Sequence, residues 1–116
     1  MRPVPKILIV DDKKINREIL KRHLQSAGYK QVLEATSGQE AVKQAKEQGP
    51  DLVLLDIVMP GMDGYEVCRR LKTDGQLKNT PVIFLSALSD TKDKVKALTQ
   101  DGVDYITKSP EYALAR

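Results

Sequence analysis

Leu52-Val53-Leu54-Leu55-Asp56 is an uninterrupted apolar run that ends in a carboxylate. A run without polar alternation is typical of a strand that is covered on both faces, as in a parallel sheet. Residues 6–10 and 81–85 have the same character, and residues 31–35 and 103–107 predict two further short strands. No apolar run exceeds four residues, so we expect no membrane-spanning segment.

Stretches of helical period alternate with these strands. We predict helices over residues 13–27, ended by Gly28, and over residues 37–48, opened by a Ser-Gly-Gln-Glu capping box. Further helices are predicted near residues 65–72 and over residues 89–102. This alternation indicates one α/β domain over the whole chain, with a doubly wound, five-stranded parallel sheet. The expected inward stripe of the first helix is Ile15, Ile19, Leu20, Leu24 and Ala27.

Polar side chains stand where these strands end, and the carboxyl ends of parallel strands meet at one edge of a sheet. We therefore expect three carboxylates, a hydroxyl and an ammonium to converge there. Clustered carboxylates with room for water favour Mg²⁺. The five residues are Asp11, Asp12, Asp56, Ser86 and Lys108.

Asp56 is the candidate nucleophile, because it is the lone acid at the end of the central strand. Beside a divalent cation its carboxylate can attack phosphorus and form an aspartyl phosphate. The metal, Lys108 and Ser86 would each meet one phosphoryl oxygen. Taken singly, Asp12 and Ser86 could be helix caps, and Lys108 a solvated charge. The same simple interpretation holds for Asp63 and Asp101.

Four motifs at these strand ends resemble those of the receiver domains of two-component response regulators, along essentially the whole chain. They are Ile-Leu-Ile-Val-Asp11-Asp12, Leu-Leu-Asp56-Ile-Val-Met-Pro60-Gly-Met-Asp-Gly64, Phe-Leu-Ser86-Ala and Tyr105-Ile-Thr-Lys108. The resemblance implies a flavodoxin-like sheet with the strand order 2-1-3-4-5.

By this resemblance, Asp56 accepts a phosphoryl group from a phosphohistidine of a sensor histidine kinase. Mg²⁺ would be held by Asp12, Asp56 and the Val58 backbone carbonyl, and by Asp11 through water. Ser86 and Tyr105 are the expected switch pair, whose two arrangements the phosphoryl group would re-weight. An output domain, a partner protein or a second copy would bind the face made by the fourth helix, the fifth strand and the last helix.

Two alternatives remain beside this interpretation. A pseudo-receiver, which binds partners without phosphorylation, would normally lack part of the acid cluster. A Mg²⁺-dependent phosphohydrolase of the haloacid-dehalogenase type would carry a second Asp where this chain has Val58. We therefore expect no enzyme that turns over a separate substrate, only self-phosphorylation from a donor and self-dephosphorylation.

Apolar Val58 and Leu88 cannot orient a water molecule for attack on the phosphoryl group, which predicts slow self-dephosphorylation.

The chain departs from the family after Lys108, where Ser109 stands in place of the usual Pro. A non-proline cis peptide costs about 2.5–4 kcal/mol, so we expect a trans Lys108–Ser109 bond. Few residues follow, and we expect a short or truncated last helix. On this basis the chain is expected to be a fragment that self-associates or is less stable than a longer form. The alternative is a naturally short receiver domain in which Tyr112 and Leu114 suffice to cover the sheet.

Composition excludes only a few function classes. The chain has 19 Lys and Arg against 16 Asp and Glu, and this net charge of +3 is too small to indicate nucleic-acid binding. Cys68 is the single cysteine, which excludes an internal disulfide and, with no secretory leader in view, favours the cytoplasm. The densest group of positive charges is Lys13, Lys14, Arg17, Lys21 and Arg22. We interpret it as a solvated helix face, or else as a docking surface for an acidic partner.

Overall fold

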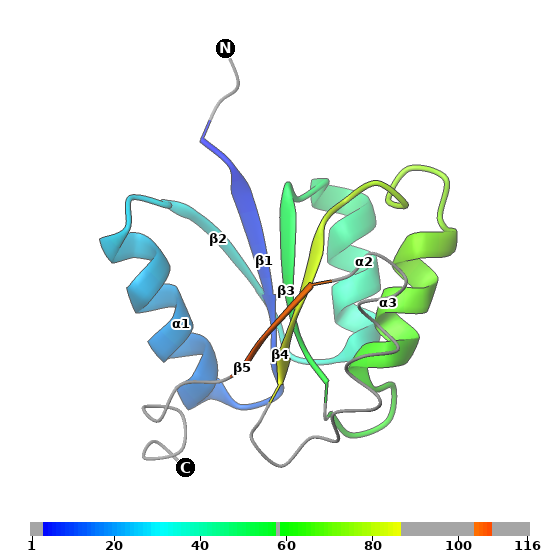
Figure 1. The fold of residues 1–116 in the computed structure, drawn as a ribbon, viewed down its shortest axis with the longest axis horizontal. Helices are drawn as coiled ribbons and strands as arrows, with labels where there is room; N and C mark the ends of the chain where they lie inside the picture. The colour runs from blue at the N-terminus through cyan, green and yellow to red at the C-terminus, as the bar shows by residue number, and fades with distance from the viewer. Residues whose placement is uncertain (1–3, 58, 87–103, 108–116) are drawn as a thin grey trace.

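Parallel strands form the centre of the molecule, as Figure 1 shows. The computed structural model describes residues 4–57, 59–86 and 104–107, with the backbone alone for residues 86 and 104–107. The sheet order is β2-β1-β3-β4-β5, so the order 2-1-3-4 of the first four strands is confirmed, with β5 beside β4. The strands are β1 (Lys6–Val10), β2 (Gln31–Ala35), β3 (Leu52–Asp56), β4 (Val82–Ser86) and β5 (Asp104–Thr107).

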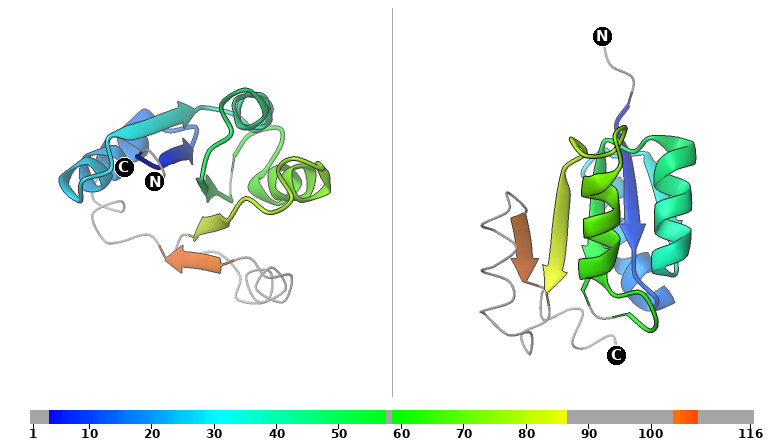
Figure 2. Two further views of the ribbon diagram at one scale, coloured as in Figure 1. Left: turned by 90° about the horizontal axis from the view of Figure 1, so that it is seen from above. Right: turned by 90° about the vertical axis from the view of Figure 1, so that its right-hand side faces the viewer.

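Helices cover both faces of this sheet (Figure 2). On one face α2 (Gly38–Gln48) and α3 (Gly64–Thr73) contribute Ala41, Ala45, Val67, Cys68 and Leu71 to a core with Leu8, Val10, Val53 and Leu55. On the other face α1 (Lys14–Ser26) packs Leu20 and Leu24 against Ile7, Leu54 and Leu85. Successive residues of β1 and β3 therefore belong to opposite faces, which explains why these strands carry no polar alternation.

Local signals at the helix ends act largely as predicted. The Gly28 backbone has φ +98° and follows Ala27, and the Gly28 and Tyr29 amides donate to the Gln25 and Leu24 carbonyls. This paired pattern ends α1 as a Schellman motif. Asp63, predicted as a cap, accepts a hydrogen bond from the Glu66 amide at the start of α3.

The capping box of α2 is half confirmed. The Ser37 hydroxyl accepts from the Glu40 amide at 3.1 Å, as the motif requires. The Glu40 carboxylate, however, accepts from the backbone amide and hydroxyl of Thr36, one residue before the cap. This carboxylate therefore fixes the end of β2 to the start of α2.

The predicted inward stripe of α1 is wrong at both ends. Ile15 is 45% exposed and Ala27 is also exposed, whereas Asn16 is buried with 5% exposure. The inward stripe follows Asn16, Leu20 and Leu24 at four-residue spacing, so the helix is rotated relative to the predicted stripe. The strand boundaries differ by a single residue: β4 begins at Val82 and β5 at Asp104.

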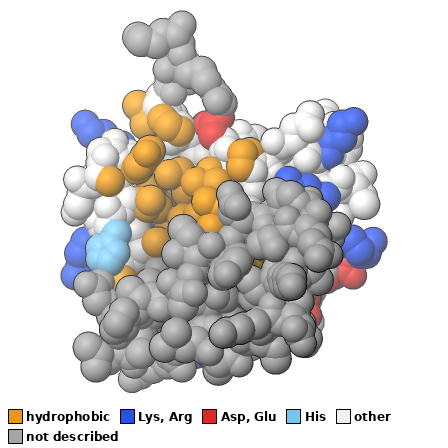
Figure 3. Space-filling model, viewed as in Figure 1, with side chains coloured by type: hydrophobic (Ala, Val, Ile, Leu, Met, Phe, Trp, Pro, Cys, Tyr) orange, Lys and Arg blue, Asp and Glu red, His pale blue; other side chains and the backbone are white. Residues whose placement is uncertain are grey.

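Apolar side chains gather on the α1 face of the sheet in Figure 3. The partly buried residues of this face are Leu20, Leu24, Leu52 and Ile83.

The predicted helix over residues 89–102, the short last helix and the Lys108–Ser109 bond lie outside the described residues. Within the described part of the chain, no helix has the length and apolar content to span a membrane.

Candidate functional site

Three carboxylates meet at the carboxyl edge of the sheet, as the sequence predicts. Asp11 and Asp12 follow β1, Asp56 ends β3, and each offers an oxygen within 4.8 Å of the others. Asp11 and Asp56 are 1% and 5% exposed, and Asp12 is half-buried. The pairing of Val10 with Leu55 in adjacent parallel strands places the residues after them side by side. The topology therefore assembles an acid cluster from residues far apart in the sequence.

Asp11 is held at its amide, its carbonyl and its carboxylate. Its amide donates to the Ala35 carbonyl at 3.2 Å, and its carbonyl accepts from Arg17 Nη1 at 3.0 Å. Its carboxylate Oδ1 accepts from the Lys13 amide at 2.9 Å. These bonds fix the start of the β1–α1 loop and hence the direction in which Asp11 presents its carboxylate.

Asp12 has the property expected of a cation ligand. Its Oδ1 atom is buried and accepts no hydrogen bond from the described residues. A buried carboxylate oxygen without a donor is costly, and so are neighbouring carboxylates without a counter-charge. Oxygen ligands from several carboxylates are the set that a hard cation such as Mg²⁺ prefers. The donor set of Asp11, Asp12 and Asp56 therefore fits a divalent metal ion.

The loop that follows Asp56 is folded tightly onto the nucleophile candidate. The Gly64 amide donates to the Ile57 carbonyl at 2.8 Å, and Gly61 takes φ +75°, a conformation that favours glycine. A Cβ atom on Gly64 would collide with the Asp56 carbonyl and the Ile57 Cα. The backbone therefore requires glycine at both positions. Gly61 permits the turn, and Gly64 lets α3 begin directly beside Asp56.

The other predicted site residues are only partly placed. Ser86 ends β4, the strand next to β3, and Tyr105 lies in β5 opposite Phe84. Both positions are at the predicted strands, while their side chains lie outside what is described. Lys108 and Val58, predicted to contact the phosphoryl group and the metal, also lie outside the described residues.

Sequence reasoning missed the role of Arg17, which was grouped with a solvated basic face. Its side chain is 13% exposed and its Nε donates to Glu34 Oε1 at 3.2 Å. Lys21 pairs with the other oxygen of Glu34 at 3.4 Å. The position of Arg17 in the first turn of the helix after the acid pair is a signal, but its partner on β2 cannot be identified without the tertiary structure.

One carboxylate near this edge has a perturbed acidity. Hydrogen bonding from the Thr36 hydroxyl is the largest cause that lowers the pKa of Glu40, opposed by burial. The Thr36 amide, Gln44 and the charge of Arg17 lower this pKa further. Glu40 is therefore held ionised by groups that favour its charged form.

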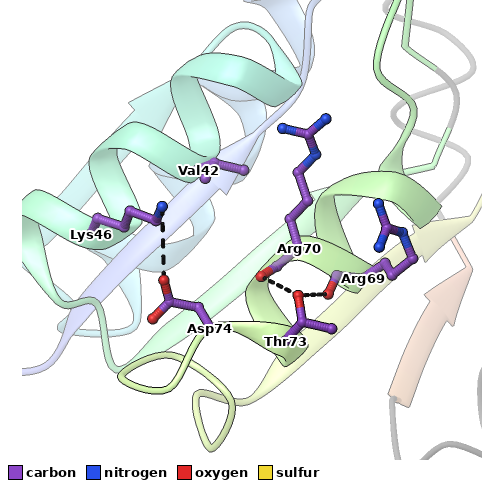
Figure 4. A pocket seen from close by; sticks show the side chains of 6 residues that line it. All are labelled: Val42, Lys46, Arg69, Arg70, Thr73 and Asp74. Carbon is purple, nitrogen blue, oxygen red and sulfur yellow. Dashed lines mark hydrogen bonds and ion pairs between the residues drawn. The ribbon is translucent and has the colours of Figure 1, made fainter.

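A groove of about 340 Å³ lies between the last turns of α2 and α3 (Figure 4). Helices α2 and α3 run back from the carboxyl edge, so this groove lies toward the opposite edge from the acid cluster. Its cations have carboxylate partners: Lys46 pairs with Asp74 at 3.8 Å, and Arg69 and Arg70 pair with Glu66. These ion pairs account for the charged residues that line the groove between α2 and α3.

Comparison with known proteins finds response regulators among the relatives of this chain. The chain is 40% identical over 103 residues to the response regulator PleD of Caulobacter vibrioides, a match that covers 89% of the chain and 22% of that protein. It is 42% identical over 113 residues to the probable transcriptional regulator ycf27 of Porphyridium aerugineum, covering 96% of the chain and 45% of that protein. The chain thus spans less than half the length of these curated relatives.

Solved structures give the same result. The N-terminal domain of a response regulator receiver protein from Methanoculleus marisnigri superimposes with a TM-score of 0.85 at 34% identity, covering 97% of this chain and 90% of that one. A putative response regulator from Chloroflexus aurantiacus has a TM-score of 0.84, also at 34% identity, over 97% and 93% of the two chains. Residues 7–114 match the model of the response regulator receiver domain. The chain therefore belongs to the response regulator receiver domain family.

Proposed function

We propose that this receiver domain is a Mg²⁺-dependent phosphoacceptor switch, with Asp56 as the residue that carries the phosphoryl group. The convergence of the Asp11, Asp12 and Asp56 carboxylates within 4.8 Å carries the proposal. Asp56 stands at the end of central strand β3, where a phosphoryl donor can approach beyond the strand ends.

In the proposed reaction, a carboxylate oxygen of Asp56 attacks the phosphorus of a phosphohistidine on a sensor histidine kinase. An O–P bond forms, the P–N bond breaks, and the leaving imidazole takes a proton from solvent. Asp12, Asp56 and the Val58 carbonyl would hold Mg²⁺ directly, and Asp11 would hold it through water. Bound Mg²⁺ supplies positive charge to a phosphoryl oxygen as negative charge develops there.

Lys108 and Ser86 complete the proposed set of phosphoryl contacts. Their ammonium and hydroxyl groups are donors of the kind that the remaining phosphoryl oxygens require. Movement of Ser86 toward the phosphoryl group, with Tyr105 following, would favour one of two arrangements of the output face. The proposed partners are a cytoplasmic sensor kinase, which donates the phosphoryl group, and an output domain or protein that binds the switched face. In this proposal the protein turns over no separate substrate.

The intact acid cluster argues for this function over the two alternatives. A pseudo-receiver needs no metal site, yet Asp12 keeps a buried oxygen that has no donor among the described residues. A phosphohydrolase of the haloacid-dehalogenase type needs a second acid two residues after Asp56, where the chain has Val58.

Incubation with Mg²⁺ and acetyl phosphate, followed by mass measurement of the intact protein, tests the proposal. We expect one added phosphoryl group on the parent chain and none on Asp56→Asn. Asp63→Asn is a matched control, because Asn caps the start of α3 as well as Asp does and should leave phosphorylation unchanged. No adduct on the parent would favour the pseudo-receiver, and turnover of phosphate monoesters would favour the hydrolase.

A further inference from the structure

Arg17 joins the β1–α1 loop to β2 at the edge where the acid cluster stands. From α1, its Nη1 donates to the Asp11 main-chain carbonyl at 3.0 Å and its Nε donates to Glu34 Oε1 at 3.2 Å. The guanidinium is planar and carries its donors in a fixed fork, so both bonds restrain one rigid group. The side chain is 13% exposed, which limits screening of these bonds by water.

The Arg17 bond differs in kind from the bonds that Asp11 makes to the Ala35 carbonyl and the Lys13 amide. The Asp11 amide is bonded to the Ala35 carbonyl and the Asp11 carboxylate to the Lys13 amide, so both of those bonds involve backbone partners that substitution leaves in place. The Arg17 bond comes from a side chain and can be removed by mutation. It also acts on the residue directly before Asp12, whose carboxylate belongs to the acid cluster.

Glu34 orients Arg17 from the neighbouring strand. Its carboxylate accepts from Arg17 through Oε1 and from Lys21 through Oε2, at 3.2 and 3.4 Å. Its main-chain carbonyl accepts from Gln44 Nε2 at 2.6 Å, which ties the same point of β2 to α2. Arg17 is thus set by a partner that is itself held from two helices.

We propose that Arg17, oriented by Glu34, is a positioning residue for the metal-binding cluster. By holding the Asp11 carbonyl, it fixes the main chain from which the Asp11 and Asp12 carboxylates reach toward Asp56. Outer groups that orient metal ligands in this way commonly change metal affinity by about 10–100-fold when they are removed. The inference rests on the proposed function, because it concerns how tightly the same cluster binds Mg²⁺.

Lys21 supplies the matched control. It lies on the same helix and pairs with the same Glu34 carboxylate, and its described contacts do not include Asp11. Lys21→Gln therefore removes a similar charge and a similar ion pair without touching the acid loop. Arg17→Gln removes the bond to Asp11, and Arg17→Lys keeps the charge but cannot keep both bonds in the same planar arrangement.

The experiment measures the Mg²⁺ dissociation constant by calorimetry and the melting temperature with and without saturating Mg²⁺. We expect Arg17→Gln to weaken Mg²⁺ binding by about tenfold, Arg17→Lys by less, and Lys21→Gln by under twofold. Arg17→Gln should also lose part of the rise in melting temperature that Mg²⁺ produces in the parent. Glu34→Gln keeps the Arg17 guanidinium but removes the negative charge that orients it, so this variant should also weaken Mg²⁺ binding. It is the second test of the proposal if Arg17→Gln does not fold.

A purely structural role predicts a different result. If Arg17→Gln lowers the melting temperature equally with and without Mg²⁺, and the dissociation constant stays within twofold of the parent value, the positioning role is overturned. That outcome leaves the proposed function intact, provided that the parent binds Mg²⁺ and accepts a phosphoryl group from acetyl phosphate. A parent that does neither overturns the proposed function, and the role of Arg17 with it.

Discussion

Gly64 packs directly against the main-chain carbonyl of Asp56, in space that a Cβ atom would fill. The contact exists because the Gly64 amide also bonds to the Ile57 carbonyl, which draws the first residue of α3 onto the end of β3. The position of the candidate phosphoacceptor and the start of the next helix are therefore set by the same contact.

Gly64→Ala is expected to destabilise the protein by about 1–3 kcal/mol or more, because the new methyl group meets backbone atoms that cannot rotate away. Chemical denaturation measures the change in the free energy of unfolding. Gly75→Ala is the control at the other end of α3, where a Cβ atom meets nothing within 4 Å. Equal effects of the two substitutions would contradict the proposed close contact at Asp56.

Asp12→Ala is expected to abolish both Mg²⁺ binding and phosphorylation, since it removes one of the three clustered carboxylates. In the absence of metal the same variant should melt at a higher temperature than the parent, because it relieves repulsion between like charges. Calorimetric titration and thermal melts in a chelating buffer measure the two effects. A variant that takes phosphate from the donor at the rate of the parent would refute the metal assignment.

Val58→Asn combined with Leu88→Glu is expected to speed loss of the phosphoryl group. Both positions lie outside the described residues, and the expectation follows from the sequence: each stands two residues beyond a predicted site residue, Asp56 or Ser86. Polar side chains there can orient the water that attacks phosphorus, whereas Val and Leu cannot. The decay of the phosphorylated mass over time measures the rate, and a decay that is unchanged or slower counts against the argument.

The lowered pKa of Glu40 predicts how the free energy of unfolding depends on pH. Its folded-state pKa is lowered from 4.5, so its contribution is complete above that value and is lost as the pH falls through the lowered pKa. Thr36→Val removes the hydroxyl that is the largest cause of the shift. We expect this variant to lose about 1 kcal/mol or less at neutral pH.

The pH profile of the same variant gives the decisive comparison. Between about pH 6 and pH 3 the parent should lose more stability than Thr36→Val, because the variant has less of the Glu40 contribution to lose. Urea denaturation at several pH values measures this difference. Parallel profiles would show that the Thr36 hydroxyl does not act through the charge of Glu40.

Asn16→Leu is expected to stabilise the protein by about 1–3 kcal/mol. Asn16 is buried, and its Oδ1 atom accepts no hydrogen bond from the residues that the structure describes. Leucine removes this oxygen and extends the stripe formed by Leu20 and Leu24. Ile15→Asn, one residue earlier and exposed, should change the free energy of unfolding little, and the two thermal melts together test the rotation of α1.

The strands were predictable because their signals are local. The apolar runs that end at Val10 and Asp56 define β1 and β3 at their observed bounds, and Ser37 and Gly49 stand at the two ends of α2. Alternation of strand and helix then suffices to place Asp11 and Asp56 at one edge, since parallel strands end together. The acid cluster could thus be predicted without coordinates.

The phase of α1 could not be predicted in the same way. This helix begins after Lys13 with no side-chain cap, so the sequence carries no capping signal that would fix which residues face the sheet. Ile15 is apolar but exposed, and the inward position is taken by polar Asn16. Packing against β1 and β3 decides this orientation, and the same holds for Arg17, whose partner Glu34 lies on another element.

The separation in sequence between Asp11 and Asp56 makes the acid cluster a property of the folded domain. Neither carboxylate can find the other until β1 has paired with β3 through contacts such as Val10 with Leu55. Pairing of strands so distant in the chain is a late and cooperative event compared with the formation of a helix. A chain in which β1 and β3 have not paired therefore has no assembled acid cluster, so we expect the proposed phosphoacceptor chemistry to be absent until the domain has folded.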